Sequence, residues 1–208
     1  MRRAVALVGA LAAVAVAAFL LLLAVDVRHY ERALADDDAT FRVDPSREDL
    51  WRPRQLVPFG AARALLGVDG QIAYRRAARL FVLGQPRVHL LEATPAMQGY
   101  RSEAAVVLWR LAQTDEDPRR RSRELNLLGV LDFLSLGDAD AVERMRGLLR
   151  ATASFRRAIA ADEEAAEEAK VNLELALRMI AEVRATNPTL RGLGGSATHR
   201  PESGGSGY

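Results

Sequence analysis

The sequence contains no cysteine, and this absence excludes several kinds of site. Disulfide scaffolds, cysteine-ligated zinc, iron–sulfur clusters and cysteine nucleophiles all require thiols. Aromatic residues make up only 6% of the 208 residues, and strand-forming side chains are sparse beside alanine and leucine. Because alanine and leucine are strong helix formers, this composition favours helices over sheet. We therefore expect an all-α fold.

Lysine is also nearly absent, since Lys170 is the only lysine among 29 basic residues. Such a bias most simply reflects a GC-rich genome, so the number of arginines alone indicates no function. Without Arg2 and Arg3, residues 26–208 hold 27 basic and 27 acidic residues, a net charge of zero. Binding to nucleic acid depends on clustered positive charge. A neutral body with interspersed charges therefore indicates no nucleic-acid partner.

The only long apolar run is at the N-terminus, where residues 4–25 carry no charged side chain. A helix of about 20 apolar residues is enough to cross the hydrocarbon core of a bilayer. The alternative is a cleaved signal peptide, whose apolar region is shorter and ends in a small-x-small site. Here the run ends in Leu22 and Leu23 before Ala24. We therefore expect an uncleaved transmembrane helix.

The flanking charges predict how this helix is oriented. Arg2 and Arg3 precede the run, whereas arginines and acids are mixed after it. Because basic flanks stay in the cytoplasm, residues 1–3 are expected inside. The chain is thus predicted to be a single-pass protein of the cell membrane with an extracytoplasmic C-terminal part.

Residues 26–59 are expected to form a juxtamembrane helix and a connector. The helix extends to Ala35 and ends in a solvated aspartate triplet at 36–38, which lacks the pattern of a calcium loop. The connector, residues 40–59, contains three prolines, which favour extended backbone. Trp51 and Phe59 are expected to pin it onto the helical body.

Residues 60–186 show helical periodicity and are expected to form one domain. The expected helices lie at 60–67, 70–83, 101–114, 118–136, 139–161 and 163–186. Asp117 and Asp162 are candidate N-caps of the fourth and sixth helices. Because the loops are short, neighbouring helices should be antiparallel. Residues 187–208, rich in Gly, Ser and Thr, are expected to form a disordered tail.

The last two helices carry a repeat-like pattern. Phe155-Arg156-Arg157-Ala158 echoes Tyr74-Arg75-Arg76-Ala77. With Ala151 before Phe155, and Asn172-Leu173 in the next helix, it resembles the small–aromatic–small packing of a tetratricopeptide repeat (TPR). The repeat-packing residues implied by the resemblance are Tyr74, Ala77, Ala151, Phe155, Ala158 and Leu173.

The resemblance to the TPR family is incomplete. It covers about 118–186, and more weakly 60–83. Glu163 stands where the family has proline, Glu174 replaces its glycine, and the 34-residue period is not kept. An alanine-rich helical hairpin of no particular family is the alternative. More loosely, the chain resembles anchored helical-repeat companions of von Willebrand A-domain membrane proteins and MoxR-type ATPases in bacteria. That resemblance implies a role as an assembly partner.

Residues for catalysis or metal binding do not gather in the sequence. His29, His89 and His199 have no metal-ligand spacing. The acidic cluster at 163–168 is most simply the solvated start of a helix. We therefore predict no enzyme activity, no cofactor, no metal and no small-molecule substrate.

The basic run at Arg119, Arg120, Arg121 and Arg123 is the candidate partner-binding site. Asp115, Glu116 and Asp117 stand just before it, so local neutralisation is the alternative. Trp109 is expected in the core, because Leu108 and Ala112 lie beside it, with the partner interface as the alternative.

Two functions remain open at this point. The first is a membrane-anchored interaction or scaffold protein that binds a protein partner; the looser resemblance implies a von Willebrand A-type membrane complex. The second is an enzyme or ligand carrier with an unrecognised site. The lack of convergent catalytic residue types favours the first.

Overall fold

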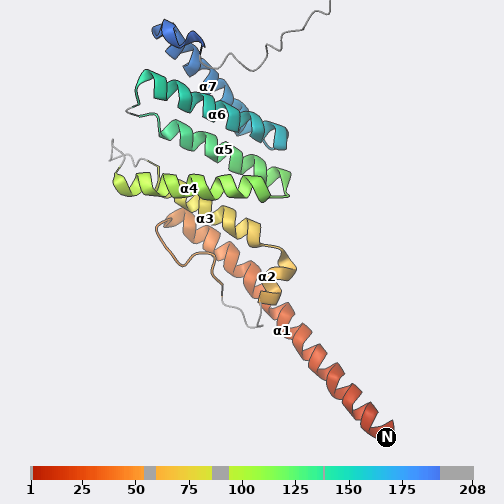
Figure 1. Ribbon diagram of the computed structural model, residues 1–208. Helices are drawn as coiled ribbons and strands as arrows, with labels where there is room; N and C mark the ends of the chain where they lie inside the picture. Colours follow the sequence, from red (N-terminus) through yellow and green to blue (C-terminus); the bar gives the residue numbers. More distant parts are fainter. Residues whose placement is uncertain (1, 54–59, 86–93, 138, 193–208) are drawn as a thin grey trace, which may run out of the picture. The chain divides into compact units, whose positions relative to one another are not determined.

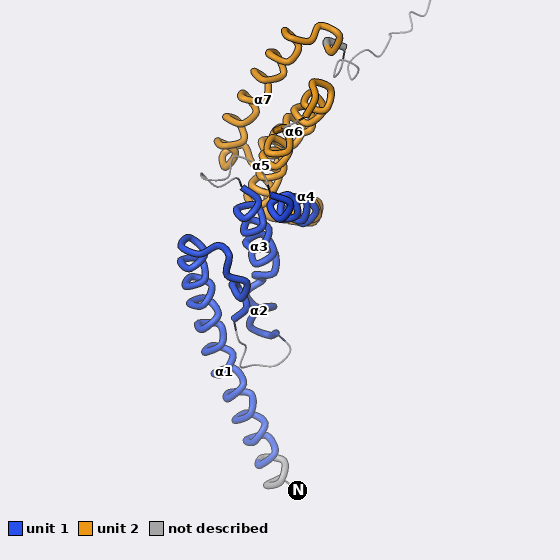
Figure 2. The backbone as a smooth tube through the Cα atoms, turned by 90° about the vertical axis from the view of Figure 1, so that its left-hand side faces the viewer, with its two compact units in different colours: residues 1–107 blue, residues 108–208 orange. Residues whose placement is uncertain are grey.

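The computed structural model describes residues 2–53, 60–85, 94–137 and 139–192. No β-strand occurs in these ranges, and the elements are helices, which confirms the all-α prediction. The chain divides into two compact units, Met1–Val107 and Leu108–Tyr208 (Figure 2). The division falls inside the region 60–186 that was expected to be one domain, so each unit is described by itself.

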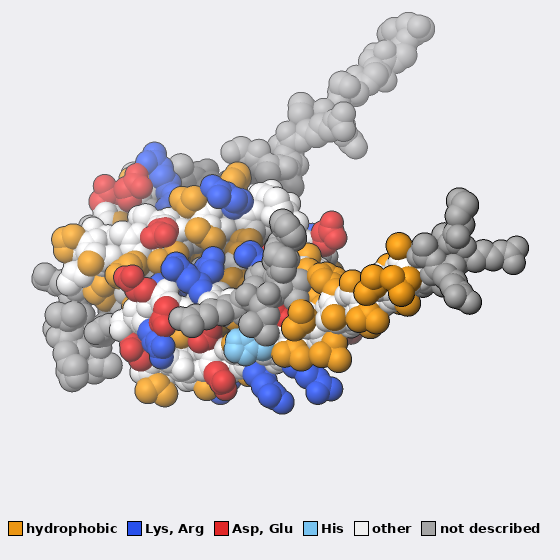
Figure 3. Space-filling model, turned by 90° about the horizontal axis from the view of Figure 1, so that it is seen from below, with side chains coloured by type: hydrophobic (Ala, Val, Ile, Leu, Met, Phe, Trp, Pro, Cys, Tyr) orange, Lys and Arg blue, Asp and Glu red, His pale blue; other side chains and the backbone are white. Residues whose placement is uncertain are grey.

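Unit 1 begins with α1 (Arg2–Val43), a single helix of 42 residues (Figure 1). At about 1.5 Å per residue it is about 63 Å long, roughly twice the thickness of the hydrocarbon core. The large apolar side chains from Leu7 to Val25 are almost all exposed. Figure 3 shows this surface in orange, with basic side chains in blue at the end that joins the rest of unit 1. By length and composition, α1 is able to cross a membrane.

The prediction that the aspartate triplet ends this helix is wrong, because α1 continues to Val43. Two of the aspartates bind other segments. Oδ2 of Asp37 accepts the backbone N–H of Trp51 at 2.7 Å, and Oδ1 of Asp38 accepts its indole N–H at 2.8 Å. The guanidinium of Arg75 donates to both oxygens of Asp38, at 2.7 and 2.8 Å. The helix therefore passes through the triplet while these carboxylates hold the connector and a later helix.

Trp51 packs with Val68 and Ile72 of the helical body, as predicted, and it also fastens the connector to α1. Its ring lies 5.3 Å from that of Phe41, centroid to centroid. Its backbone is left-handed, with φ of 57°, which is costly for a residue with a side chain. The buried cluster around it consists of Tyr30, Leu34, Leu50, Trp51, Val68 and Ile72. Phe59, the other expected anchor, lies outside the described residues.

Three shorter helices follow: α2 (Ala61–Leu66), α3 (Asp69–Leu83) and α4 (Pro95–Thr114). α4 begins at Pro95 rather than at 101. Oγ1 of Thr94 accepts the N–H of Met97 at 3.3 Å, and a proline fits the first helical position because it has no N–H to leave unpaired. α4 runs from unit 1 into unit 2.

Unit 2 is built on α5 (Pro118–Leu134), α6 (Ala141–Ala161) and α7 (Glu167–Thr186), and α6 packs against both of the others (Figure 1). Asp117 caps α5 as predicted, and Asp140 caps α6. Asp162 does not cap α7. Its Oδ1 accepts the N–H of Ala165 at 3.0 Å and closes the preceding turn, so α7 starts later than predicted.

Phe155 is at the centre of unit 2 and is fully buried. Its ring lies 5.5 Å from that of Phe133 and directly against Gly129, both on α5. The small residues at the expected spacing are buried in the same cluster, which is Ala112, Leu125, Ala151, Phe155, Ala158, Ala166, Ala169 and Ala176. The aromatic side chain thus fills a space toward the preceding helix, with α7 residues completing the cluster.

The start of the expected disordered tail is ordered. Pro188–Gly192 forms a short 3₁₀ helix, and Leu190 is buried against α6 and α7 in a second cluster. Disorder was therefore the wrong expectation for this segment, because one leucine finds apolar partners. Residues 193–208 lie outside the described residues.

Candidate functional site

The turn that leads into α5 is organised around Asp115. Oδ1 of Asp115 accepts the N–H of Asp117 at 2.9 Å, and Asp117 in turn accepts the N–H groups of Arg119 and Arg120 at 3.0 and 3.3 Å. These bonds satisfy N–H groups that the first turn of a helix leaves without partners. The turn thus fixes the direction in which the arginine side chains leave α5.

Arg120 and Arg121 are both bound within this turn. The guanidinium of Arg120 donates to both carboxylate oxygens of Asp115, through Nε to Oδ2 and through Nη2 to Oδ1 at 2.6 Å. Nη1 of Arg121 donates to the carbonyl of Asp115 at 3.3 Å. Burial acts to raise the pKa of Asp115, but hydrogen bonds from Arg120 and the Asp117 backbone outweigh it and hold that pKa low. The geometry of these two arginines therefore agrees with local neutralisation by Asp115.

Arg119 and Arg123 are arranged differently. Both are exposed, and their side chains make no ion pair within the described ranges. They are four residues apart, and Asn126 follows three residues later, so all three share one face of α5. The basic run therefore consists of two arginines that build the turn and two that face outward.

Asn126 connects this face of α5 to α7. Its Oδ1 accepts a hydrogen bond from Nδ2 of Asn172 at 3.0 Å, and its Nδ2 lies 3.4 Å from Oε2 of Glu168. On α7, Glu167, Glu168, Val171 and Asn172 line an open depression of about 400 Å³. We call this surface the α5–α7 face, and it comprises Arg119, Arg123 and Asn126 on α5 with Glu168, Val171, Asn172 and Leu175 on α7.

Apolar side chains are exposed on the α7 side of this face. Val171 is 66% exposed and Leu175, four residues on, is 51% exposed. Large apolar groups that share one helical face and remain in water are typical of contact surfaces rather than of a core. The α5–α7 face therefore combines two cations, the exposed carboxylate of Glu168 and an apolar strip.

Glu124 is a buried acid that the sequence analysis did not single out. It is 0% exposed, and neither of its carboxylate oxygens accepts a hydrogen bond from a described residue. Burial, then the charge of Asp115 and a hydrogen bond with it, raise the pKa of Glu124 to about 8. The protonated form has an O–H to donate to Asp115, whereas the ionised form has none. Glu124 is thus a buried acid that stays protonated at neutral pH and interacts with Asp115.

Trp109 is exposed, so the expectation of a core position is wrong. It is 58% exposed, while Leu108 and Ala112 are buried. One residue of α-helix corresponds to a rotation of about 100°, which takes Trp109 off the face that its neighbours bury.

The other candidate residues occupy ordinary structural positions. Ala77 is fully buried and Tyr74 half-buried on α3, and Leu173 packs against the Phe155 cluster. Of the histidines, only His29 is in the described ranges, where it is exposed; His89 and His199 are outside them. Within those ranges, no three of the His, Asp and Glu side chains are grouped to hold a metal ion.

Comparison with known proteins identifies no relative of this chain. No family model, no curated protein and no solved structure matches it.

Proposed function

We propose that this chain is a membrane-anchored interaction protein, whose helical body binds another protein through the α5–α7 face. The observation that carries the proposal is the division of the arginine run. Arg120 and Arg121 are bound within their turn, while Arg119 and Arg123 face outward without an ion pair among the described residues. Arginines beside exposed apolar side chains are typical of the residues that dominate protein interfaces.

The proposed location is the cell membrane, with α1 as a single span. No described part of the chain buries the apolar surface of its first half, and a bilayer would cover it. Arg2 and Arg3 favour a cytoplasmic N-terminus, and in this proposal the part of unit 1 after the span and all of unit 2 lie outside the cytoplasm.

The proposed arrangement of α5, α6 and α7 is TPR-like. In this interpretation α5 and α6 form one helical pair, and α7 is the first helix of the next. The contact between Asn126 and Asn172 joins the two first helices, as stacking of repeats requires. The α5–α7 face would then be the inner surface of the stack.

The chemistry of this face indicates the kind of partner. Two exposed guanidinium groups favour a carboxylate-bearing segment, and Val171 with Leu175 favours apolar side chains next to it. We therefore propose an acidic, partly apolar protein segment as the ligand. Membrane complexes that contain von Willebrand A-type proteins are the first place to look for it, given the resemblance noted from the sequence.

Affinity capture from native membranes tests this proposal. Full-length protein with Arg119→Glu and Arg123→Glu should lose a specific co-purifying protein that the native chain retains. Acidic side chains are favourable in the first turn of a helix, so Arg119→Glu should not unfold α5. The loss of capture should be largest at low salt, because exposed charges are screened at high ionic strength.

The matched control is Arg156→Glu with Arg157→Glu, which reverses two exposed arginines on α6. The control should retain the partner that the α5 variant loses. Equal capture by both variants, or equal loss in both, would exclude the α5–α7 face as the binding surface.

A further inference from the structure

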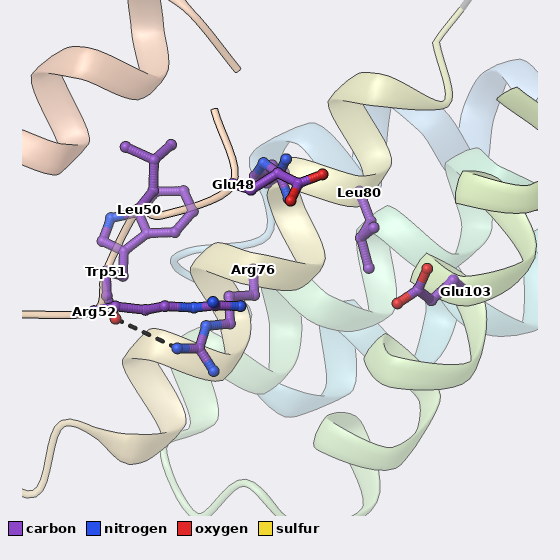
Figure 4. Close-up of a pocket in the computed structure, with 8 residues that line it drawn as sticks. Glu48, Leu50, Trp51, Arg52, Arg76, Leu80 and Glu103 are labelled. Atoms are coloured by element: carbon purple, nitrogen blue, oxygen red, sulfur yellow. Dashed lines mark hydrogen bonds between the residues drawn. The ribbon is translucent and has the colours of Figure 1, made fainter. Parts of the chain in front are cut away.

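A small pocket in unit 1 lies between the connector, α3 and α4, with a volume of about 170 Å³ (Figure 4). Three arginines and two glutamates belong to its lining: Arg52, Arg76, Arg79, Glu48 and Glu103. It is separate from the α5–α7 face, and the proposed function does not use it.

Arg79 has a structural task in this pocket. Its Nε donates to the carbonyl of Pro45 and its Nη2 to that of Ser46, both at 2.9 Å. The guanidinium therefore fastens the connector to α3.

Arg52 and Arg76 are not used in this way. Nη2 of Arg76 makes one long hydrogen bond, 3.4 Å, to the carbonyl of Trp51, drawn as the dashed line in Figure 4. Neither arginine forms an ion pair with a carboxylate in the described part of the chain. Three neighbouring acids are already paired: Asp38 with Arg75, Asp49 with Arg47, and Asp69 with Arg63.

The two guanidinium groups are close enough to act on each other. Burial lowers the pKa of Arg76, and the positive charges of Arg52 and Arg63 lower it further. Figure 4 shows Arg52 and Arg76 side by side next to Trp51. Both side chains are exposed, so water screens part of their repulsion, and a counter-charge would relieve the rest. Glu48 and Glu103, although in the same lining, form no ion pair with either arginine in the described ranges.

The backbone of Trp51 holds this arrangement in place. Its left-handed φ of 57° is a strained conformation, kept by its bonds to Asp37 and Asp38. The turn at Trp51 directs its carbonyl to Arg76 and brings Arg52 to the same side. Strain of this kind is often retained where it positions groups for a ligand.

We propose that Arg52 and Arg76 bind a phosphate group in this pocket. Guanidinium groups present paired N–H donors that match the oxygens of phosphate, and a phosphate between them would supply the counter-charge. Glu48 and Glu103 limit the net positive charge of the pocket. The phosphate would therefore be held by hydrogen bonds from the two guanidinium groups rather than by long-range electrostatic attraction.

The phosphate has two possible sources, a lipid headgroup or free phosphate. Tyr30 of α1 lies near enough to Arg76 to raise the pKa of its guanidinium, against the larger lowering effects. It is five residues beyond Val25, or about 8 Å along the helix, which is close to the headgroup layer if residues 4–25 span the bilayer. Lipid headgroups can therefore reach the neighbourhood of the pocket. The experiment has one arm for each source of phosphate.

The first arm titrates the full-length chain, in a phosphate-free maltoside detergent, with inorganic phosphate and follows binding by calorimetry. The second arm adds phosphatidylglycerol and counts retained lipids by native mass spectrometry. The variant Arg52→Gln with Arg76→Gln should weaken binding at least tenfold in one of these arms, and that arm identifies the source. Arg28→Gln with Arg32→Gln is the control, since it removes two exposed charges closer to the apolar stretch and should change binding less than twofold.

A second variant tests the pocket without removing its donors. Glu103→Gln should strengthen binding several-fold, because it removes a negative charge from the lining. Three results would overturn the proposal: no binding by the native chain in either arm, equal weakening by the control, or unchanged binding in Glu103→Gln. Circular dichroism of each variant establishes that the helices are retained.

Discussion

The ring of Phe155 on α6 occupies the space that a side chain at Gly129 on α5 would need. A Cβ built on Gly129 would overlap Cε1 of that ring, so α5 and α6 approach this closely only because position 129 has no side chain. Phe155 has no exposed surface, and Phe133, on α5 like Gly129, flanks its ring. The packing of unit 2 therefore depends on one aromatic residue and one glycine.

Phe155→Ala should lower the free energy of unfolding by about 3–5 kcal/mol, the usual cost of removing a buried aromatic side chain. The loss combines apolar surface returned to water with a cavity that the alanine-rich surroundings cannot fill. Thermal unfolding of the full chain followed by circular dichroism measures it. An unchanged melting temperature would contradict the central role of this ring.

Gly129→Ala should be destabilising by about 1–3 kcal/mol, the range for an overpacked core, although alanine is the better helix former. Gly99→Ala on α4 is the matched control, because no atom lies within 4 Å of a Cβ there. It should leave stability unchanged or raise it by up to about 1 kcal/mol. Equal effects at the two glycines would show that Phe155 yields easily to a methyl group.

Glu124 should make the stability of the protein depend on pH. Its folded pKa is about 8, above the ordinary value of 4.5, so the folded state holds a proton that the unfolded state releases earlier. Its contribution to stability is fully present below about pH 4.5, declines as the pH rises and is lost once the pH passes about 8. Glu124→Gln should flatten this decline and raise the melting temperature at pH 8.5 more than at pH 5.

Glu116→Gln is the control for that measurement, since Glu116 is exposed in the same turn. Between pH 5 and pH 8.5, the melting temperature of this variant should change as much as that of the native protein. If the melting temperature of Glu124→Gln also changes as much as that of the native protein, ionisation of Glu124 does not determine how stability depends on pH.

Arg120→Ala and Arg119→Ala should differ in stability although they are neighbours. Removing Arg120 leaves the buried carboxylate of Asp115 without its main partner, which should cost about 1–3 kcal/mol. Removing the exposed Arg119 should change stability by less than about 0.5 kcal/mol. Melting temperatures of the two variants measured side by side check this, and a reversed order would mean that the turn is organised differently.

The proposed anchor predicts how the protein fractionates. The native chain should remain in membranes after washing with high salt and with carbonate, because about 20 apolar residues in the bilayer are not released by either. A reporter fused after Tyr208 should be active only outside the cytoplasm. A soluble mature form that lacks residues 1–25 would instead favour a cleaved signal peptide.

The sequence by itself determined the features that arise from neighbouring residues. The apolar run before Asp26, the helical composition and the cap at Asp117 depend on local spacing and propensity, and the structure has the corresponding helices. The burial of Phe155 also follows from the periodicity of its helix.

Tertiary packing decided the features that local spacing and helix propensity do not determine. Local chemistry makes an aspartate triplet a good place to end a helix, but Asp38 binds Trp51 and Arg75, which come from elsewhere in the chain. Trp109 has the same local surroundings as a core residue, yet its helix turns it outward. Which arginines are bound and which face solvent, and why Glu124 is neutral, depend likewise on the groups that the fold brings around them. Periodicity shows that a helix has a buried face, whereas the helices packed around it decide how wide that face is.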